Sequence, residues 1–130
     1  MTRLESETVV VQKPAKEVFG FFSDFSSFQK LMPQQVVDWV LDEEGCSFKI
    51  KGMASLGLKY ESKTPYSEVV MVSKGKTPFD FRIIIQITDA GNACSVKLSL
   101  EAELNPFLKM MAEKPLTNFL NLLAEKLKES

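Results

Sequence analysis

The amino-acid sequence predicts an α+β fold in which a strongly curved antiparallel sheet of six to seven strands wraps around a long C-terminal helix. Strand-like segments separated by turn residues recur about every ten residues between positions 35 and 104, as an antiparallel meander requires. An amphipathic helical pattern follows them at the C-terminal end. Because one helix cannot bury its apolar stripe alone, we expect the apolar face of the sheet to cover it.

The N-terminal part is predicted to hold one strand and two short helices. The strand covers residues 3–12 and is centred on a β-branched run of valines. Pro14 suits the first turn of a helix, because its missing N–H costs nothing there. Ser23 and Asp24 break that helix and can cap a second one, which is expected to end at Pro33.

Six further strands are predicted from apolar alternation and from the turn residues between them. Their expected bounds are 35–42, 46–53, 56–63, 67–74, 78–88 and 93–104. Asn105 and Pro106 have the residue types of an N-cap and a first helical position, so we expect a helix from there through Lys128. Pro115 lies within this helix and is expected to kink it or to divide off its first turns.

Strand alternation predicts which side chains face the helix. In strands 35–42 and 56–63 the expected inward residues are Val37, Trp39, Leu41, Leu56, Leu58, Tyr60 and Ser62. Asp38, Lys63 and Arg82 fall on the opposite face, in water. The predicted interior is therefore almost entirely hydrocarbon and aromatic, which suits a small-molecule pocket better than an acid–base site.

Composition narrows the classes of function. The chain has 130 residues, which we interpret as a single domain over 1–130. Its net charge is −1 with both signs interspersed, which argues against a nucleic-acid partner because phosphate binding needs a concentrated basic surface. There is no histidine, which removes Ser-His-Asp and Cys-His nucleophiles and the usual zinc sites. We therefore predict no metal and no cofactor.

The two cysteines and the N-terminus bear on the compartment. The first residues are polar and acidic, and no apolar run approaches the length of a membrane helix, so no integral membrane segment is expected. A cytoplasmic location follows, in which Cys46 and Cys94 are expected to be free thiols. We expect both to be small core residues and not nucleophiles.

Two sequence runs resemble a known family. They are VVVQKPAKEVF, from Val9 to Phe19, and FSSFQKLMP, from Phe25 to Pro33. The first is similar to the opening strand and the P-x-x-x-V-[FW] helix start of the START-like superfamily, and the second to its second helix and closing proline. That superfamily includes birch-pollen allergen relatives, polyketide cyclases and dehydrases, and coenzyme Q-binding proteins. The resemblance covers essentially the whole chain and implies a helix-grip fold around a cavity.

The apolar interior and the resemblance together predict the binding or transport of a small hydrophobic ligand, such as a lipid, a quinone or a polyketide-like compound. Trp39 is a candidate stacking platform and Tyr60 a candidate hydrogen-bond donor, although each would also serve as ordinary core. The predicted ligand-binding residues are Trp39, Phe48, Ile50, Leu58, Tyr60, Met71, Phe81, Ile83, Leu98, Phe107, Met111 and Phe119.

Two other functions stay open. The first is an enzyme of the cyclase or dehydratase type, in which Asp38 would act as a general acid if its strand had a different register and turned it inward. The second is a protein-interaction module of the co-chaperone kind, which would show an exposed apolar patch in place of a deep pocket.

Overall fold

The computed structural model describes residues 2–30, 32, 34, 36–50, 55–75, 77 and 79–129. Its strands are β1 (Thr2–Glu5), β2 (Val9–Val11), β3 (Val36–Leu41), β4 (Gly45–Ile50), β5 (Ser55–Thr64), β6 (Glu68–Ser73), β7 (Phe81–Ala90) and β8 (Ala93–Ala102). Its helices are α1 (Ala15–Phe22), α2 (Phe25–Gln29) and α3 (Pro106–Glu129). The predicted helix end at Pro33 and the predicted strand residues 35, 51–53 and 78 lie outside the described residues.

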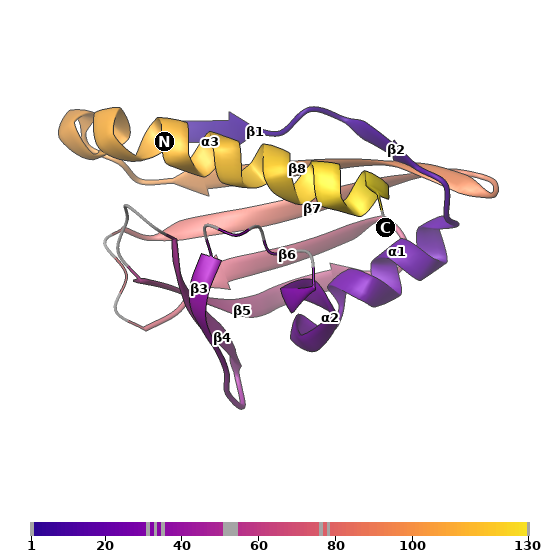
Figure 1. Ribbon diagram of the computed structural model, residues 1–130, viewed down its shortest axis with the longest axis horizontal. Helices are drawn as coiled ribbons and strands as arrows, with labels where there is room; N and C mark the ends of the chain where they lie inside the picture. Colours follow the sequence, from indigo (N-terminus) through magenta and orange to yellow (C-terminus); the bar gives the residue numbers. More distant parts are fainter. Residues whose placement is uncertain are drawn as a thin grey trace.

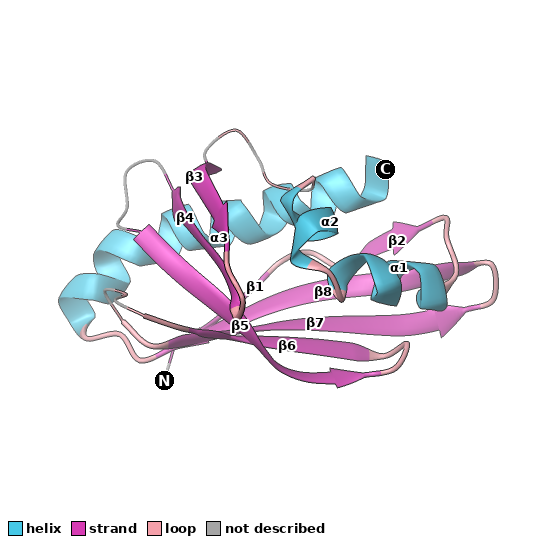
Figure 2. Ribbon diagram, turned by 90° about the horizontal axis from the view of Figure 1, so that it is seen from below, coloured by secondary structure: helices cyan, strands magenta, loops and turns pink. Residues whose placement is uncertain are grey.

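All strand pairs are antiparallel and form one curved sheet in the order β1-β8-β7-β6-β5-β4-β3, with β2 also paired to β8. The helix α3 lies across the concave side of this sheet (Figure 1). Its backbone is nearest to β1, β2 and β8, while α1 packs on β6 and β7 and α2 packs on β3. Figure 2 shows α1 and α2 beside α3 over the same face. The predicted helix-grip architecture is confirmed.

The helix α3 begins where the sequence indicates. The Asn105 side-chain oxygen Oδ1 accepts a hydrogen bond from the Leu108 N–H (2.8 Å), as an N-cap does. The helix continues through Pro115 without a break, so the predicted division is not found. Residue Met111, four positions earlier, is exposed, so the carbonyl that the proline leaves without a helical donor lies on the solvent side. None of the described helices is both long enough and apolar enough to cross a membrane.

The predicted strand 3–12 is in fact two strands. Leu4 lies opposite Leu100 in β8, whereas Val9 lies opposite Val96, so one extra residue is inserted between β1 and β2. Ser6 occupies the join and is buried; its N–H donates to the Leu98 carbonyl (2.8 Å), and its hydroxyl oxygen accepts from the Leu98 N–H (3.0 Å). The serine side chain therefore replaces a strand carbonyl where the backbone turns away.

A bulge in β3 also changes the predicted facing of its residues. Val36 lies opposite Ile50, but Val40 lies opposite Ser47, so β3 carries one extra residue at Asp38–Trp39. Asp38 takes a left-handed backbone conformation (φ 57°), which aspartate tolerates better than most residues. Val36, and not Val37 as predicted, packs against the core, while Trp39 keeps its predicted inward direction.

The prediction for Leu41 is wrong as well, because this side chain is 44% exposed. Leu41 lies near the end of the β3–β4 hairpin, which projects beyond the helices in Figure 1. Alternation predicts the face of a strand on which a residue lies, but not whether another element covers that face.

A third bulge lies in β5. Tyr60 is opposite Met71, whereas Ser62 is opposite Val70 and Lys63 is opposite the buried Val69. The predicted positions of Ser62 and Lys63 are therefore exchanged: Lys63 shares the inner side of the sheet, and Ser62 is exposed on the outer side. Bulges commonly re-aim side chains in this way beside functional sites.

Candidate functional site

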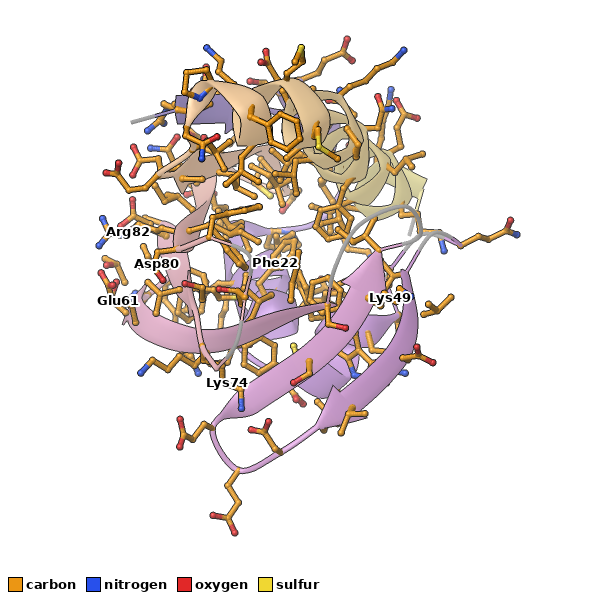
Figure 3. All side chains as sticks on the ribbon, turned by 90° about the vertical axis from the view of Figure 1, so that its left-hand side faces the viewer. Phe22, Lys49, Glu61, Lys74, Asp80 and Arg82 are labelled. Carbon is orange, nitrogen blue, oxygen red and sulfur yellow. The ribbon has the colours of Figure 1, made fainter. Side chains whose placement is uncertain are left out.

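The interior between the sheet and α3 contains most of the residues that the sequence nominates for ligand binding. Those that are buried there are Phe48, Ile50, Leu58, Met71, Phe81, Ile83, Leu98 and Phe119. Trp39 and Tyr60 are partly buried and pack against the same cluster. Figure 3 shows Phe22 among the side chains that fill the space beneath α3, whereas Glu61, Asp80 and Arg82 point away from it.

A continuous run of aromatic rings crosses this interior from the short helices to α3. The ring centroids of Phe22 and Phe28 are 5.7 Å apart, and those of Phe28 and Trp39 are 6.3 Å apart. Trp39 stacks on Phe48 at 5.5 Å, and Phe48 stacks on Phe119 at 6.0 Å. These side-chain contacts therefore connect β3 and β4 to α3. Planar apolar groups of a ligand would find matching surfaces there.

Trp39 carries the polar group of this aromatic run, its indole N–H. Its indole Nε1 is buried and has no hydrogen-bond partner in the structure. A buried donor without a partner costs about 1–3 kcal/mol, so such groups are few in folded proteins. Among the buried side-chain nitrogen and oxygen atoms of the described residues, this is the one without a partner.

The Tyr60 hydroxyl, by contrast, already has a partner within the protein. It donates to the Phe22 carbonyl at the end of α1 (2.6 Å), and the Tyr60 ring stacks on Phe25 at 4.2 Å. Burial raises the pKa of Tyr60 well above its ordinary value. The Lys63 ammonium lies 4.1 Å from the centre of the Tyr60 ring and donates to the Ser23 carbonyl (3.0 Å). Tyr60 and Lys63 thus hold the C-terminal end of α1 against the sheet.

We therefore predict that Tyr60→Phe lowers the free energy of unfolding by about 0.5–1.5 kcal/mol, the usual net value of one hydrogen bond. Urea unfolding measures this change. Tyr66→Phe is a matched control, because Tyr66 is 49% exposed in the β5–β6 turn and should change stability by less than about 0.5 kcal/mol. Equal losses in the two variants would contradict the structural role of the Tyr60 hydroxyl.

The remaining candidate residues lie away from the interior. Asp38 is exposed at the β3 bulge, so the alternative in which it lies inside is not what the structure shows. Cys46 and Cys94 are free and buried, as predicted. Burial, with a smaller contribution from Asp42, raises the pKa of Cys46 to about 12, and burial raises that of Cys94. Neither thiol is activated as a nucleophile.

Phe107 and Met111, which are among the predicted ligand-binding residues, are exposed to 63% and 60%, and Met110 is exposed to 76%. The first turns of α3 project beyond the end of the sheet in both ribbon views, so the sheet does not reach these side chains (Figures 1 and 2). The helical stripe that does reach the interior begins at Ala112 and Leu116.

Arg82 lies on the outer face, as alternation predicts, and its guanidinium pairs with the Glu61 carboxylate at 3.1 Å. A hollow of about 450 Å³ beside this pair is lined mostly by charged and polar residues, among them Lys59, Asp80 and Glu101. Such a surface offers little to an apolar ligand.

Comparison with known proteins supports the fold and not a specific activity. No protein-family model matches the sequence, and no curated protein matches it either. The norcoclaurine synthase of Thalictrum flavum has a similar structure, with a TM-score of 0.75 at 13% identity, over 98% of this chain and 84% of that one. A START superfamily protein from Mycobacterium smegmatis matches with a TM-score of 0.69 at 15% identity, over 98% and 94% of the two chains.

The chain shares the helix-grip fold of these two structures. The fold that the resemblance in the sequence implies is therefore confirmed. The di-domain ARO/CYC protein BexL of the BE-7585A biosynthetic pathway also has a similar structure, with a TM-score of 0.73 at 17% identity; the match covers 99% of this chain and 46% of that one. Since one fold hosts many activities, these similarities leave the choice of function to the site itself.

Proposed function

We propose that the protein binds a small, mostly apolar molecule in the interior between the sheet and α3. The observation that carries this proposal is the chemistry of that interior. Among the described residues, the buried set contains no carboxylate, ammonium or guanidinium group, and, apart from Ser6 and Ser99, its side chains are aromatic, aliphatic or sulfur-containing. Such a surface attracts apolar matter and offers no charged group for proton transfer.

The class of ligand stays a prediction. A lipid, a quinone or a polyketide-like compound would each suit an aromatic interior. The resemblance of the sequence to the START-like superfamily supports these three classes. A cytoplasmic location is likewise a prediction, supported by two buried thiols without a disulfide.

Native mass spectrometry of the protein, purified without denaturation, tests the proposal. We expect an added mass at near-stoichiometric level that organic extraction releases. A protein that carries no extractable molecule, and whose side-chain methyl resonances in the interior do not respond to added apolar compounds, would contradict it.

The β3 bulge provides a matched pair of variants that locates the ligand. Val36 faces the interior beside Ile50, while its neighbour Val37 lies opposite Lys49 on the outer side. We predict that Val36→Trp lowers the occupancy of the co-purified molecule about tenfold, because the larger ring would take space that the ligand needs, and such overpacking costs about 1–3 kcal/mol. Val37→Trp should leave the occupancy unchanged. Equal occupancy in the two variants would place the ligand elsewhere.

One observation favours a second function, that of a protein-interaction module. Phe107, Met110 and Met111 form an exposed apolar patch on the first turns of α3, which is the feature expected of that alternative. If the patch binds protein, Met110→Lys should abolish any concentration-dependent association seen by sedimentation velocity. A monomer at all concentrations would remove self-association as its role.

The enzyme alternative has less support in the described residues. Two of the similar structures are named as a synthase and an ARO/CYC protein, yet Asp38 is exposed and the Tyr60 hydroxyl is bonded to a backbone carbonyl. A cyclase or dehydratase would need a proton donor or acceptor facing the substrate.

A further inference from the structure

We propose that the indole N–H of Trp39 recognises a neutral acceptor oxygen, such as the carbonyl of a ketone, quinone or ester, on the apolar ligand. This inference rests on the proposed function, because it requires that a molecule enters the interior. It assigns a specificity-determining group and narrows the ligand to apolar molecules that carry such an oxygen.

The first step of the argument concerns residue type. In the aromatic run from Phe22 to Phe119, the other rings are phenylalanines, and Trp39 is the only tryptophan of the chain. A phenylalanine at position 39 could also stack on Phe48 without burying an unpaired donor. The tryptophan therefore carries a cost in stability that packing alone does not require. A ligand acceptor would remove that cost in the bound state.

The second step concerns how the indole is positioned. The extra residue in β3, with Asp38 at φ 57°, turns Trp39 inward from an edge strand that is otherwise poorly covered. Phe48 stacks on the indole at an interplanar angle of 17°, and Phe28 lies across it at 39°. The ring is therefore held between two well-buried side chains, so its N–H has a defined direction before a ligand arrives. Binding would then cost little ordering of this donor.

The third step concerns the charge of the ligand. Lys63 and Lys126 are exposed, and both already donate to backbone carbonyls. Lys63 donates to Ser23 (3.0 Å), and Lys126 donates to Met32 (3.1 Å). No charged group belongs to the buried part of the described chain. A carboxylate drawn to the indole would lose its hydration without gaining a counter-charge. A neutral carbonyl oxygen accepts the hydrogen bond without that penalty.

Two probes of nearly equal shape test this inference on the full-length protein. 2-Acetylnaphthalene carries a carbonyl, and 2-isopropenylnaphthalene replaces its oxygen with a CH₂ group. We expect the ketone to bind about 5- to 30-fold more tightly than the hydrocarbon, as one hydrogen bond to an otherwise unpaired buried donor implies. In Trp39→Phe the ratio of the two dissociation constants should fall to about one, because the donor is absent.

A second measurement does not depend on the variant. The single tryptophan gives one indole ¹H–¹⁵N resonance, which should move downfield on addition of the ketone and not on addition of the hydrocarbon. Equal affinities for both probes, or a preference that survives in Trp39→Phe, would overturn the inference while leaving the proposed function intact. Binding of neither probe, with no response of any interior resonance, would overturn both.

Discussion

Replacing Gly45 with alanine is expected to destabilise the protein by about 3 kcal/mol, at the upper end of the usual cost of overpacking, because the added methyl group has no space. An ideal Cβ at this position would lie 1.9 Å from the Leu58 carbonyl oxygen and 2.9 Å from the Leu58 carbonyl carbon. Both atoms belong to the backbone of β5, so no side-chain rotation can relieve the overlap. The strands β4 and β5 would have to separate at the point where Gly45 pairs with Lys59.

The surrounding contacts make that separation more costly. The Gly45 N–H donates to the Asp42 side-chain oxygen Oδ1 (2.8 Å), and its carbonyl accepts from the Asp42 N–H (2.9 Å). Asp42 also forms an ion pair with Lys74, which ties the β3–β4 hairpin to the segment after β6. Movement of Gly45 would disturb this turn together with the sheet.

Chemical or thermal unfolding of the variant measures the effect, and Gly20→Ala is the control. Gly20 lies exposed in α1, and an added Cβ there would meet nothing within 4 Å. That substitution should raise the free energy of unfolding by about 0.5–1 kcal/mol, because alanine favours a helix over glycine. A Gly45→Ala protein as stable as the parent would show that β4 and β5 are spaced differently from the structure described.

Local sequence signals were sufficient for the order of the elements. Asn105 and Pro106 predicted the start of α3, and an alternating pattern predicted the inward direction of Trp39, Leu58 and Tyr60. These features depend on neighbouring residues in the chain, which is why they can be read from it.

The three bulges depend on the partner strand and could not be predicted in the same way. Around Tyr60 the residues alternate without interruption, yet β5 contains an extra residue that turns Lys63 toward α1. At Ser6 the signal is a small polar residue at a buried position of the strand, and at Asp38 it is a residue that tolerates positive φ. Either would be compatible with an uninterrupted strand.

In the candidate site, too, local patterns predicted some residues correctly, while the positions of others depend on distant segments. Trp39 and Phe48 were nominated from alternation, and both lie in the interior. Phe107 and Met111 were nominated because they are apolar residues at the helix start, but apolarity does not reveal where the sheet ends. The unpaired Trp39 N–H results from the absence of an acceptor among distant segments, and a sequence gives no sign of it.

Phe48→Ala is expected to lower the free energy of unfolding by about 3–5 kcal/mol, the usual loss for a truncated buried phenylalanine. Phe48 is 1% exposed and stacks on both Trp39 and Phe119, so its removal interrupts the aromatic run between β4 and α3. Phe107→Ala is the matched control, since Phe107 is 63% exposed and should change stability by less than about 0.5 kcal/mol. Urea unfolding of both variants gives the comparison.

The same variant connects stability with binding. Truncation at Phe48 leaves apolar space bordered by Trp39 and Phe119, and dry apolar cavities of this kind accept small aromatic molecules. Added naphthalene should therefore raise the melting temperature of Phe48→Ala more than that of Phe107→Ala, because it binds the folded state. If naphthalene stabilises the two variants equally, truncation at Phe48 does not open a space that naphthalene enters.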